Sequence, residues 1–70
     1  MIPEGFLTPR QLEICKLVAQ GLQNKQIAEV IGLTPNTVKV YVHRIYDKTG
    51  MGNRLELALW YTAKTEGANG

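Results

Sequence analysis

The sequence alternates between segments with helically spaced apolar residues and short segments rich in glycine and proline. Apolar residues that recur three and four positions apart place one side of a helix against a core. Four segments show this spacing, and each is preceded by a residue that suits a helix N-terminus. The pattern predicts helices over residues 9–20, 24–31, 35–49 and 54–65, with flexible ends at 1–6 and 66–70.

The starts of these helices carry recognisable capping residues. Thr8 and Thr34 each precede a proline, and a threonine hydroxyl can accept a backbone N–H of the first turn. Proline suits the first helical position because the N–H it lacks would have no partner there. Gln11 stands three residues after Thr8 and completes a capping box. Asn24 and Asn53 are the caps expected for the other two helices.

The second and third helices are separated by three residues, Gly32 to Thr34. So short a turn makes consecutive helices cross steeply, which is typical of a helix-turn-helix, although a helical hairpin packed on another element is an alternative. Ala28 is small where the helices approach, and Gly32 permits left-handed backbone. Apart from the β-branched residues of the third helix, strand and hairpin signals are missing from the sequence. The prediction is an all-α four-helix bundle that contains a helix-turn-helix and has no wing.

The third helix divides into a buried side and an outward side. Its apolar spacing and strong cap outweigh the strand preference of its many β-branched residues. The predicted buried residues are Val38, Tyr41, Val42, Ile45 and Thr49. The predicted outward residues are Lys39, Val40, His43, Arg44 and Asp47.

Length and residue inventory argue against an enzyme. A chain of 70 residues forms one domain and has little room for both a core and a large cleft. It offers no Ser–His–acid set, no paired carboxylates in a plausible cleft and no glycine-rich phosphate loop. Cys15 lies on an apolar stripe and is expected to be a buried small hydrophobe. One cysteine and one histidine are too few for a zinc site, so we expect no catalytic residue, metal, cofactor or small-molecule ligand.

The charge is unevenly distributed. The net charge is +2, but residues 1–35 sum to zero while residues 36–54 hold four basic groups against one acidic group, which gives +3. This stretch is either a surface for a polyanion or a solvated helix face. The sequence carries no membrane span and no secretory signal. With a single cysteine, a reducing bacterial cytoplasm is the expected location.

Several short motifs together resemble one family. They are Leu7-Thr8-Pro9-Arg10, Glu13-Ile14, Ala19-Gln20-Gly21-Leu22, Asn24-Lys25-Gln26-Ile27-Ala28, Ile31-Gly32-Leu33, Thr37-Val38-Lys39-Val40, Ile45, Lys48, Gly50, Asn53-Arg54 and Glu56-Leu57-Ala58. Their order resembles the LuxR/GerE-type DNA-binding domain, which is also the output domain of NarL/FixJ-type response regulators. The resemblance covers about residues 7–63. Three positions depart from it: Gln11 stands for a usual Glu, Tyr41 for a usual His, and Thr49 for a usual Leu.

The resemblance implies that residues 35–49 enter the major groove, where base edges are distinguishable. It makes Lys39, Val40 and His43 the base readers. Lys39 could donate to a guanine, and Val40 could pack on a thymine methyl. His43 is equally compatible with a base contact, a phosphate contact and no contact.

Phosphate contacts fix the register on DNA without reading sequence. The candidates are basic, hydroxyl-bearing or amide side chains within or just before that helix, or at the start of the second one. They are Lys25, Thr34, Asn36, Thr37, Tyr41, Arg44 and Lys48. Tyr41 could instead pack its ring on the core. Arg54 is expected to pair with a carboxylate such as Glu13 inside the domain.

The fourth helix is more apolar than one buried side requires, and surplus apolar surface marks an interaction site. Leu57, Ala58 and Tyr61 are expected to face the core. The expected two-fold homodimer interface comprises Leu55, Leu59, Trp60, Thr62 and Ala63. The alternative is that Trp60 closes the core of a monomer.

The leading hypothesis is a bacterial transcription regulator that binds double-stranded DNA, with two half-sites for the dimer and RNA polymerase as a further candidate partner. The alternative is a protein-interaction module of the same fold that does not bind DNA. A sensor or receiver domain is not visible in these residues, and both a free-standing regulator and part of a longer one fit them.

Overall fold

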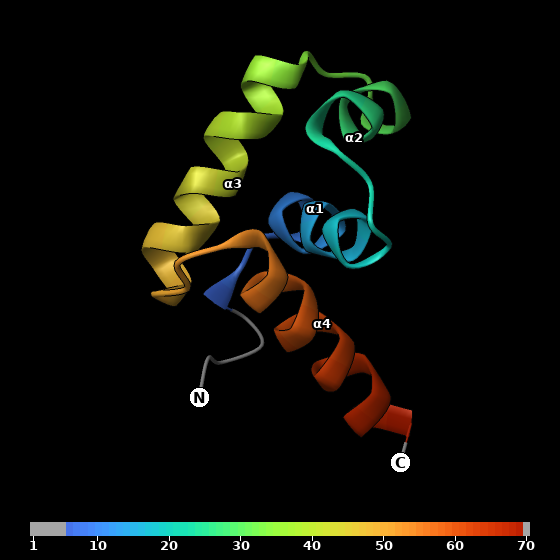
Figure 1. The fold of residues 1–70 in the computed structure, drawn as a ribbon, viewed down its shortest axis with the longest axis vertical. Coiled ribbons are helices and arrows are strands. Elements are labelled where there is room, and N and C mark those ends of the chain that lie inside the picture. The colour runs from blue at the N-terminus through green and yellow to red at the C-terminus, as the bar shows by residue number, and fades with distance from the viewer. Residues whose placement is uncertain (1–5, 70) are drawn as a thin grey trace.

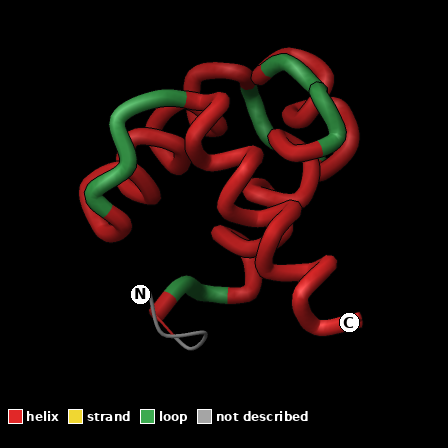
Figure 2. Tube along the Cα trace, turned by 60° about the horizontal axis from the view of Figure 1, so that its bottom comes forward, coloured by secondary structure: helices red, strands yellow, loops and turns green. Residues whose placement is uncertain are grey.

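A computed structural model describes residues 6–69 of the chain, with side chains described for residues 6–65. It contains four helices: α1 (Pro9–Ala19), α2 (Asn24–Ile31), α3 (Pro35–Thr49) and α4 (Arg54–Asn69). Figure 1 shows α3 along one side of the molecule, with α1 and α2 beside it and α4 below. Helices and short loops account for the whole described chain, and no strand occurs in it (Figure 2). The prediction of an all-α fold is confirmed.

The helix bounds agree with the predicted ones except at two C-termini. α1 ends at Ala19, one residue before the predicted end, and α4 continues to Asn69 instead of stopping at Thr65. α4 therefore extends into the segment that we expected to be a flexible end. A lone glycine such as Gly67 costs a helix only about 1 kcal/mol relative to alanine, which does not suffice to end it. The expected flexible residues 1–5 and residue 70 lie outside the described part.

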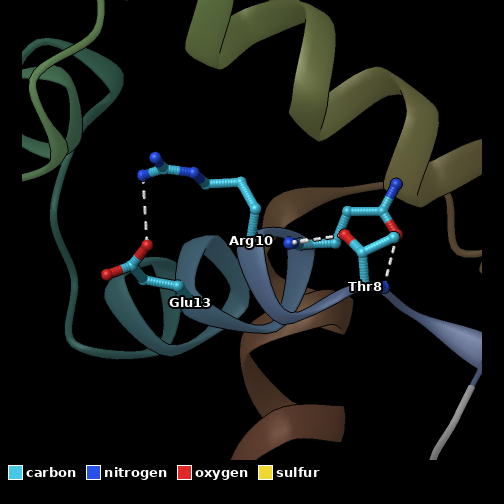
Figure 3. A network of polar contacts seen from close by, with 4 residues as sticks. Thr8, Arg10 and Glu13 are labelled. Atoms are coloured by element: carbon cyan, nitrogen blue, oxygen red, sulfur yellow. Dashed lines mark hydrogen bonds and ion pairs between the residues drawn. The ribbon is translucent and has the colours of Figure 1, made fainter.

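The predicted caps form at three of the four helices. Thr8 Oγ1 accepts the N–H of Gln11 at 3.1 Å, and Gln11 Oε1 accepts the N–H of Thr8 at 3.0 Å (Figure 3). Thr34 Oγ1 accepts the N–H of Thr37 at 3.2 Å. Before α4, Asn53 Oδ1 accepts the N–H of Glu56 at 2.8 Å.

The cap predicted for α2 is wrong. Asn24 is already the first residue of the helix, and Gln23 precedes it with an extended backbone. Gln26 Oε1 accepts the N–H of Gln23 at 2.8 Å, so a side chain from within the helix caps the residue that precedes it. Asparagine is the stronger cap by local preference, but the Asn24 side chain makes a tertiary contact instead, which is described below.

The turn between α2 and α3 has the geometry of a helix-turn-helix. Gly32 ends α2 in the left-handed conformation at φ 75°, which a residue with a Cβ adopts only with strain. Leu33 donates its N–H to the carbonyl of Ala28 at 3.0 Å, and Ala28 is 1% exposed where the two helices meet. α2 packs against α3, as Figure 1 also shows, and both contribute to one core.

The core is centred on α1, which packs against each of the other three helices. The most deeply buried side chains are Ile14, Cys15, Ile27, Val38, Ile45 and Leu57, so every helix contributes at least one. On α1, Leu12 is half-buried, while the polar Gln11 is buried. α1 needs a wide buried surface because it is covered on several sides. None of the described helices is long and apolar enough to cross a membrane.

Candidate nucleic-acid interface

The outward side of α3 carries the predicted base readers. Lys39, Val40 and His43 are all exposed, and they stand at successive positions of one face because α-helical residues four apart lie above one another. The face is backed by Val38, which is fully buried on the opposite side of the helix. Val40 is 45% exposed, so an apolar side chain stands between two polar ones. The structure therefore brings the three predicted residues together on one accessible face.

A shallow depression of about 210 Å³ borders this face. It is lined by Thr37, Val40, Tyr41 and Arg44, which follow one another along α3 at helical spacing. Tyr41 is half-buried and packs against the core, while it also lines the depression. The ring therefore serves the core and borders the outward surface at the same time. The His43 ring meets Tyr46 edge-on, with 6.1 Å between the ring centroids, and this contact supports the His43 side chain.

The N-terminus of α3 gathers three more predicted contacts. Thr34 and Asn36 are exposed and Thr37 is half-buried. The hydroxyls of Thr34 and Thr37 lie 2.9 Å apart and share a hydrogen bond, so the cap holds both side chains in place. Backbone N–H groups at a helix N-terminus favour an anion. Lys25 is exposed in the first turn of α2, and Arg44 is exposed on α3.

Lys48 is directed toward the rest of the domain. Its Nζ lies 3.1 Å from Gln11 Oε1 and 3.4 Å from the carbonyl oxygen of Phe6, and it donates to both. The same ammonium lies 5.6 Å from the centre of the Phe6 ring. Lys48 therefore contacts Phe6, the last residue of the N-terminal segment that we expected to be flexible. Sequence reasoning missed these contacts because Gln11 and Phe6 lie 37 and 42 residues from Lys48 along the chain.

Arg54 has the structural role that we expected but different partners. Its guanidinium donates to Asn24 Oδ1 at 2.8 Å and to the carbonyl oxygen of Leu22 at 2.7 Å. The predicted pairing with Glu13 is wrong, since Glu13 pairs with Arg10 at 3.2 Å on the exposed side of α1 (Figure 3). The contact to Arg54 also explains why Asn24 does not cap α2.

The Thr49 side chain forms hydrogen bonds at the C-terminus of α3. Its hydroxyl donates to the carbonyl oxygen of Ile45 at 2.8 Å and accepts the N–H of Met51 at 3.3 Å. Gly50 then reverses the chain with φ 77°. The hydroxyl of Thr49 therefore holds the chain where the family pattern usually has an apolar leucine.

Cys15 is fully buried in α1, as predicted. Burial raises the pKa of its thiol to about 11, because the surrounding apolar side chains disfavour a thiolate. Within the described residues, no three His, Cys, Asp or Glu side chains come together as a set that could hold a metal ion.

The residues predicted for a dimer interface divide into two groups. Leu55 and Leu59 are 67% and 61% exposed, and Ala63, four residues further, is exposed as well. We call Leu55, Leu59 and Ala63 the α4 apolar stripe. Trp60 and Thr62 are half-buried, and Trp60 packs against the domain's own core together with Ala58 and Tyr61. Leu57 is fully buried, as expected.

Comparison with known proteins places these helices in a family. The family model described as bacterial regulatory proteins, luxR family, matches residues 6–61. The nitrate/nitrite response regulator NarL of Escherichia coli is 48% identical over 54 residues, which cover 77% of this chain and 25% of NarL.

The two-component response regulator PprB of Pseudomonas aeruginosa is 49% identical over 55 residues, which cover 79% of this chain and 20% of PprB. The response regulator NarP of Escherichia coli is 36% identical over 59 residues, 84% of this chain and 27% of NarP. The chain thus spans about a quarter of the length of these relatives. The chain belongs to the luxR family of bacterial regulatory proteins, and its four helices form the DNA-binding helix-turn-helix domain of that family.

Proposed function

We propose that the chain binds specific sites on double-stranded DNA by inserting α3 into the major groove, and that it regulates transcription in the bacterial cytoplasm. The observation that carries this proposal is the shared exposure of Lys39, Val40 and His43 on α3 of a helix-turn-helix. The major groove admits one α-helix and displays a different donor and acceptor pattern for each base pair. RNA polymerase is a further candidate partner of such a regulator.

Each base reader has its own chemistry. The Lys39 ammonium can donate to O6 and N7 of guanine, and a thymine methyl can pack on the exposed Val40 side chain. His43 is held by Tyr46 beside this pair and contacts either a base edge or a phosphate. The depression at Thr37, Val40, Tyr41 and Arg44 leaves room for part of the DNA backbone.

The phosphate contacts surround the reading face. Lys25 and Arg44 supply exposed positive charge from two helices, and Thr34, Asn36 and Thr37 supply polar groups at the start of α3. Each phosphate that a lysine or arginine neutralises releases counterions from DNA, so affinity falls as salt rises. Tyr41 reaches the same surface through its phenol ring.

We also propose that two copies pair through α4 and bind two half-sites. The α4 apolar stripe supports this proposal because two leucines more than half exposed lie one helical turn apart. Thr62 borders the stripe, and Trp60 contributes its half-exposed edge while its body closes the core. A second half-site adds about 1–3 kcal/mol of discrimination for each base pair that it reads.

Selection of DNA from a random pool with this chain tests the proposal. Fluorescence anisotropy then compares the recovered duplex with a mixed-sequence duplex of equal length. We expect a clear preference for the recovered duplex and a palindromic sequence. Equal affinity for the two duplexes would contradict sequence-specific binding, and a preferred site without palindromy would contradict pairing.

The exposed leucines also support a second candidate, a protein-interaction module of the same fold that binds no DNA. The two candidates differ in their response to a polyanion. A DNA-binding chain is retained on heparin and released at moderate salt. A chain that passes through heparin unretained at low salt indicates the interaction module.

A further inference from the structure

Lys48 lies on the side of α3 opposite Lys39. Lys48 stands nine positions after Lys39, which at 3.6 residues per turn is about two and a half turns, so the two side chains point in opposite directions. Lys48 lies instead beside the buried side of α3, where it reaches α1 across the domain. The Lys48 ammonium is thus engaged by acceptors within the domain.

The contacts of Lys48 join three parts of the chain. Its ammonium donates to Gln11 Oε1 on α1 and to the carbonyl oxygen of Phe6 before α1, and it lies over the Phe6 ring. A cation over an aromatic face is attracted to the ring. The contacts made by Lys48 with Gln11 and Phe6 are called the Lys48 clasp below.

Gln11 is the side chain on α1 that accepts a hydrogen bond from Lys48 in the clasp. Its Oε1 accepts two hydrogen bonds, one from the N–H of Thr8 and one from Lys48 Nζ. The residue is 6% exposed, and a polar group so buried needs its partners. Lys48 therefore binds to an acceptor that the capping box already holds in a defined position.

We propose that Lys48 is a positioning residue for DNA recognition and not a phosphate contact. By tying the last turn of α3 to the start of α1, the Lys48 clasp fixes the orientation of α3 within the domain. Base contacts depend on that orientation because hydrogen bonds weaken steeply with angle, whereas phosphate contacts depend mainly on charge. Loss of the clasp therefore lowers discrimination between sequences more than it lowers affinity for DNA in general. The proposal rests on the proposed function.

The test compares Lys48→Met with Lys25→Met, two exposed lysines that lose their charge in the same way. Anisotropy titrations over a salt series use the duplex recovered from the random pool and a mixed-sequence duplex. For Lys48→Met we expect affinity for the recovered duplex to fall roughly 3–30-fold, affinity for the mixed duplex to change less than about twofold, and the salt slope to stay unchanged. For Lys25→Met we expect both duplexes to weaken alike and the slope to fall by about 0.9.

A double-mutant cycle adds a measurement that does not change when a variant merely loses stability. Gln11→Met lies on α1, away from the DNA-facing side, and is expected to lower the same affinity ratio. If Lys48 acts through Gln11, the double variant loses no more of the ratio than Lys48→Met does. Circular dichroism checks that each variant folds. If Gln11→Met does not fold, the salt slope and the affinity ratio between the two duplexes, measured for Lys48→Met, still test the proposal.

Two results overturn the proposal: an unchanged affinity ratio in Lys48→Met, or a slope that falls by about 0.9 as in Lys25→Met. A wild-type chain without preference for any duplex refutes the proposed function, and the positioning role falls with it. That result is seen before any variant is measured, so the two failures are distinguishable.

Discussion

α3 and α4 expose very different surfaces although they share one core. α3 presents Lys39, His43 and Arg44 around a single exposed valine, while α4 presents the apolar stripe of two leucines and an alanine. Both helices bury apolar residues on their inner sides. Their difference therefore lies in the outward positions alone, where packing imposes no residue type.

The comparison shows how a domain of this size can carry two kinds of interface. A charged and polar face with one aliphatic group suits the major groove, which offers polar edges and methyl groups. An apolar face suits a second copy of itself, because removal of apolar area from water drives association. Within the described residues, the α4 apolar stripe stays exposed.

The largest expected effect comes from a change that removes both surfaces together. Ile45 is fully buried where α3 meets the core. Ile45→Ala is expected to lower the free energy of unfolding by about 2–5 kcal/mol because it removes apolar contacts and leaves a cavity. Urea denaturation followed by circular dichroism measures it. DNA affinity and self-association should both decline as the folded fraction does, and a variant with unaltered stability would show that Ile45 is not part of the shared core.

A change in the α4 apolar stripe is expected to affect one surface only. Leu59→Glu places a charge in the proposed interface. It removes about 1.5–3 kcal/mol of burial free energy for each leucine. Because a two-fold axis places Leu59 of both copies in the interface, this loss occurs twice per dimer. Dimer affinity should fall roughly 100-fold or more. Sedimentation velocity over a concentration series measures this effect.

Val30→Glu is the matched control, since Val30 is 62% exposed on α2 and Leu59 is 61% exposed. The control should associate as the wild type does, and both variants should keep their stability within about 0.5 kcal/mol. Equal effects of the two substitutions on association would remove the distinction between α4 and the rest of the surface.

High pH is expected to lower the free energy of unfolding modestly through Cys15 in the shared core, without changing the exposed residues of α3 and α4. Burial raises the pKa of Cys15 to about 11 from 9.0, so the folded state holds the thiol proton more tightly than the unfolded state does. The stability that the protonated Cys15 thiol contributes to the folded state is fully present below pH 9 and is lost as the pH rises toward 11. The loss is about 1–3 kcal/mol at most, at 1.36 kcal/mol per pH unit.

Because tyrosines also titrate near pH 10, the informative quantity is the stability of the wild type relative to Cys15→Ala. This difference should shrink between pH 9 and 11 and stay constant between pH 6 and 8. A difference that does not depend on pH would mean that the thiol titrates alike in both states.

Features that depend on neighbouring residues could be predicted from the sequence. The Thr8–Gln11 box and the Thr34 cap join residues three apart, and Gly32 ends α2 through its own backbone freedom. The exposed positions of α3 follow from helical spacing once the buried side is identified. The sequence therefore predicted the helix-turn-helix and the exposed Lys39, Val40 and His43 correctly.

Features that depend on tertiary contact could not be predicted. Lys48 and Arg54 both count as basic residues in a positive stretch, yet each reaches acceptors at least 30 residues away. Which acceptor a long side chain reaches depends on how the helices are packed. Asn24 shows the same limit, because its contact with Arg54 overrides its preference for a cap.

The most direct test of α3 as a sequence reader compares Lys39→Met with Lys25→Met on two duplexes. Anisotropy gives the affinity of each variant for the duplex recovered from the random pool and for a mixed-sequence duplex. We predict that Lys39→Met loses about 5–150-fold on the recovered duplex, or ~1–3 kcal/mol, and far less on the mixed duplex. Lys25→Met should weaken both alike. If Lys39→Met also weakens both duplexes equally, Lys39 contributes charge alone and α3 does not read bases through it.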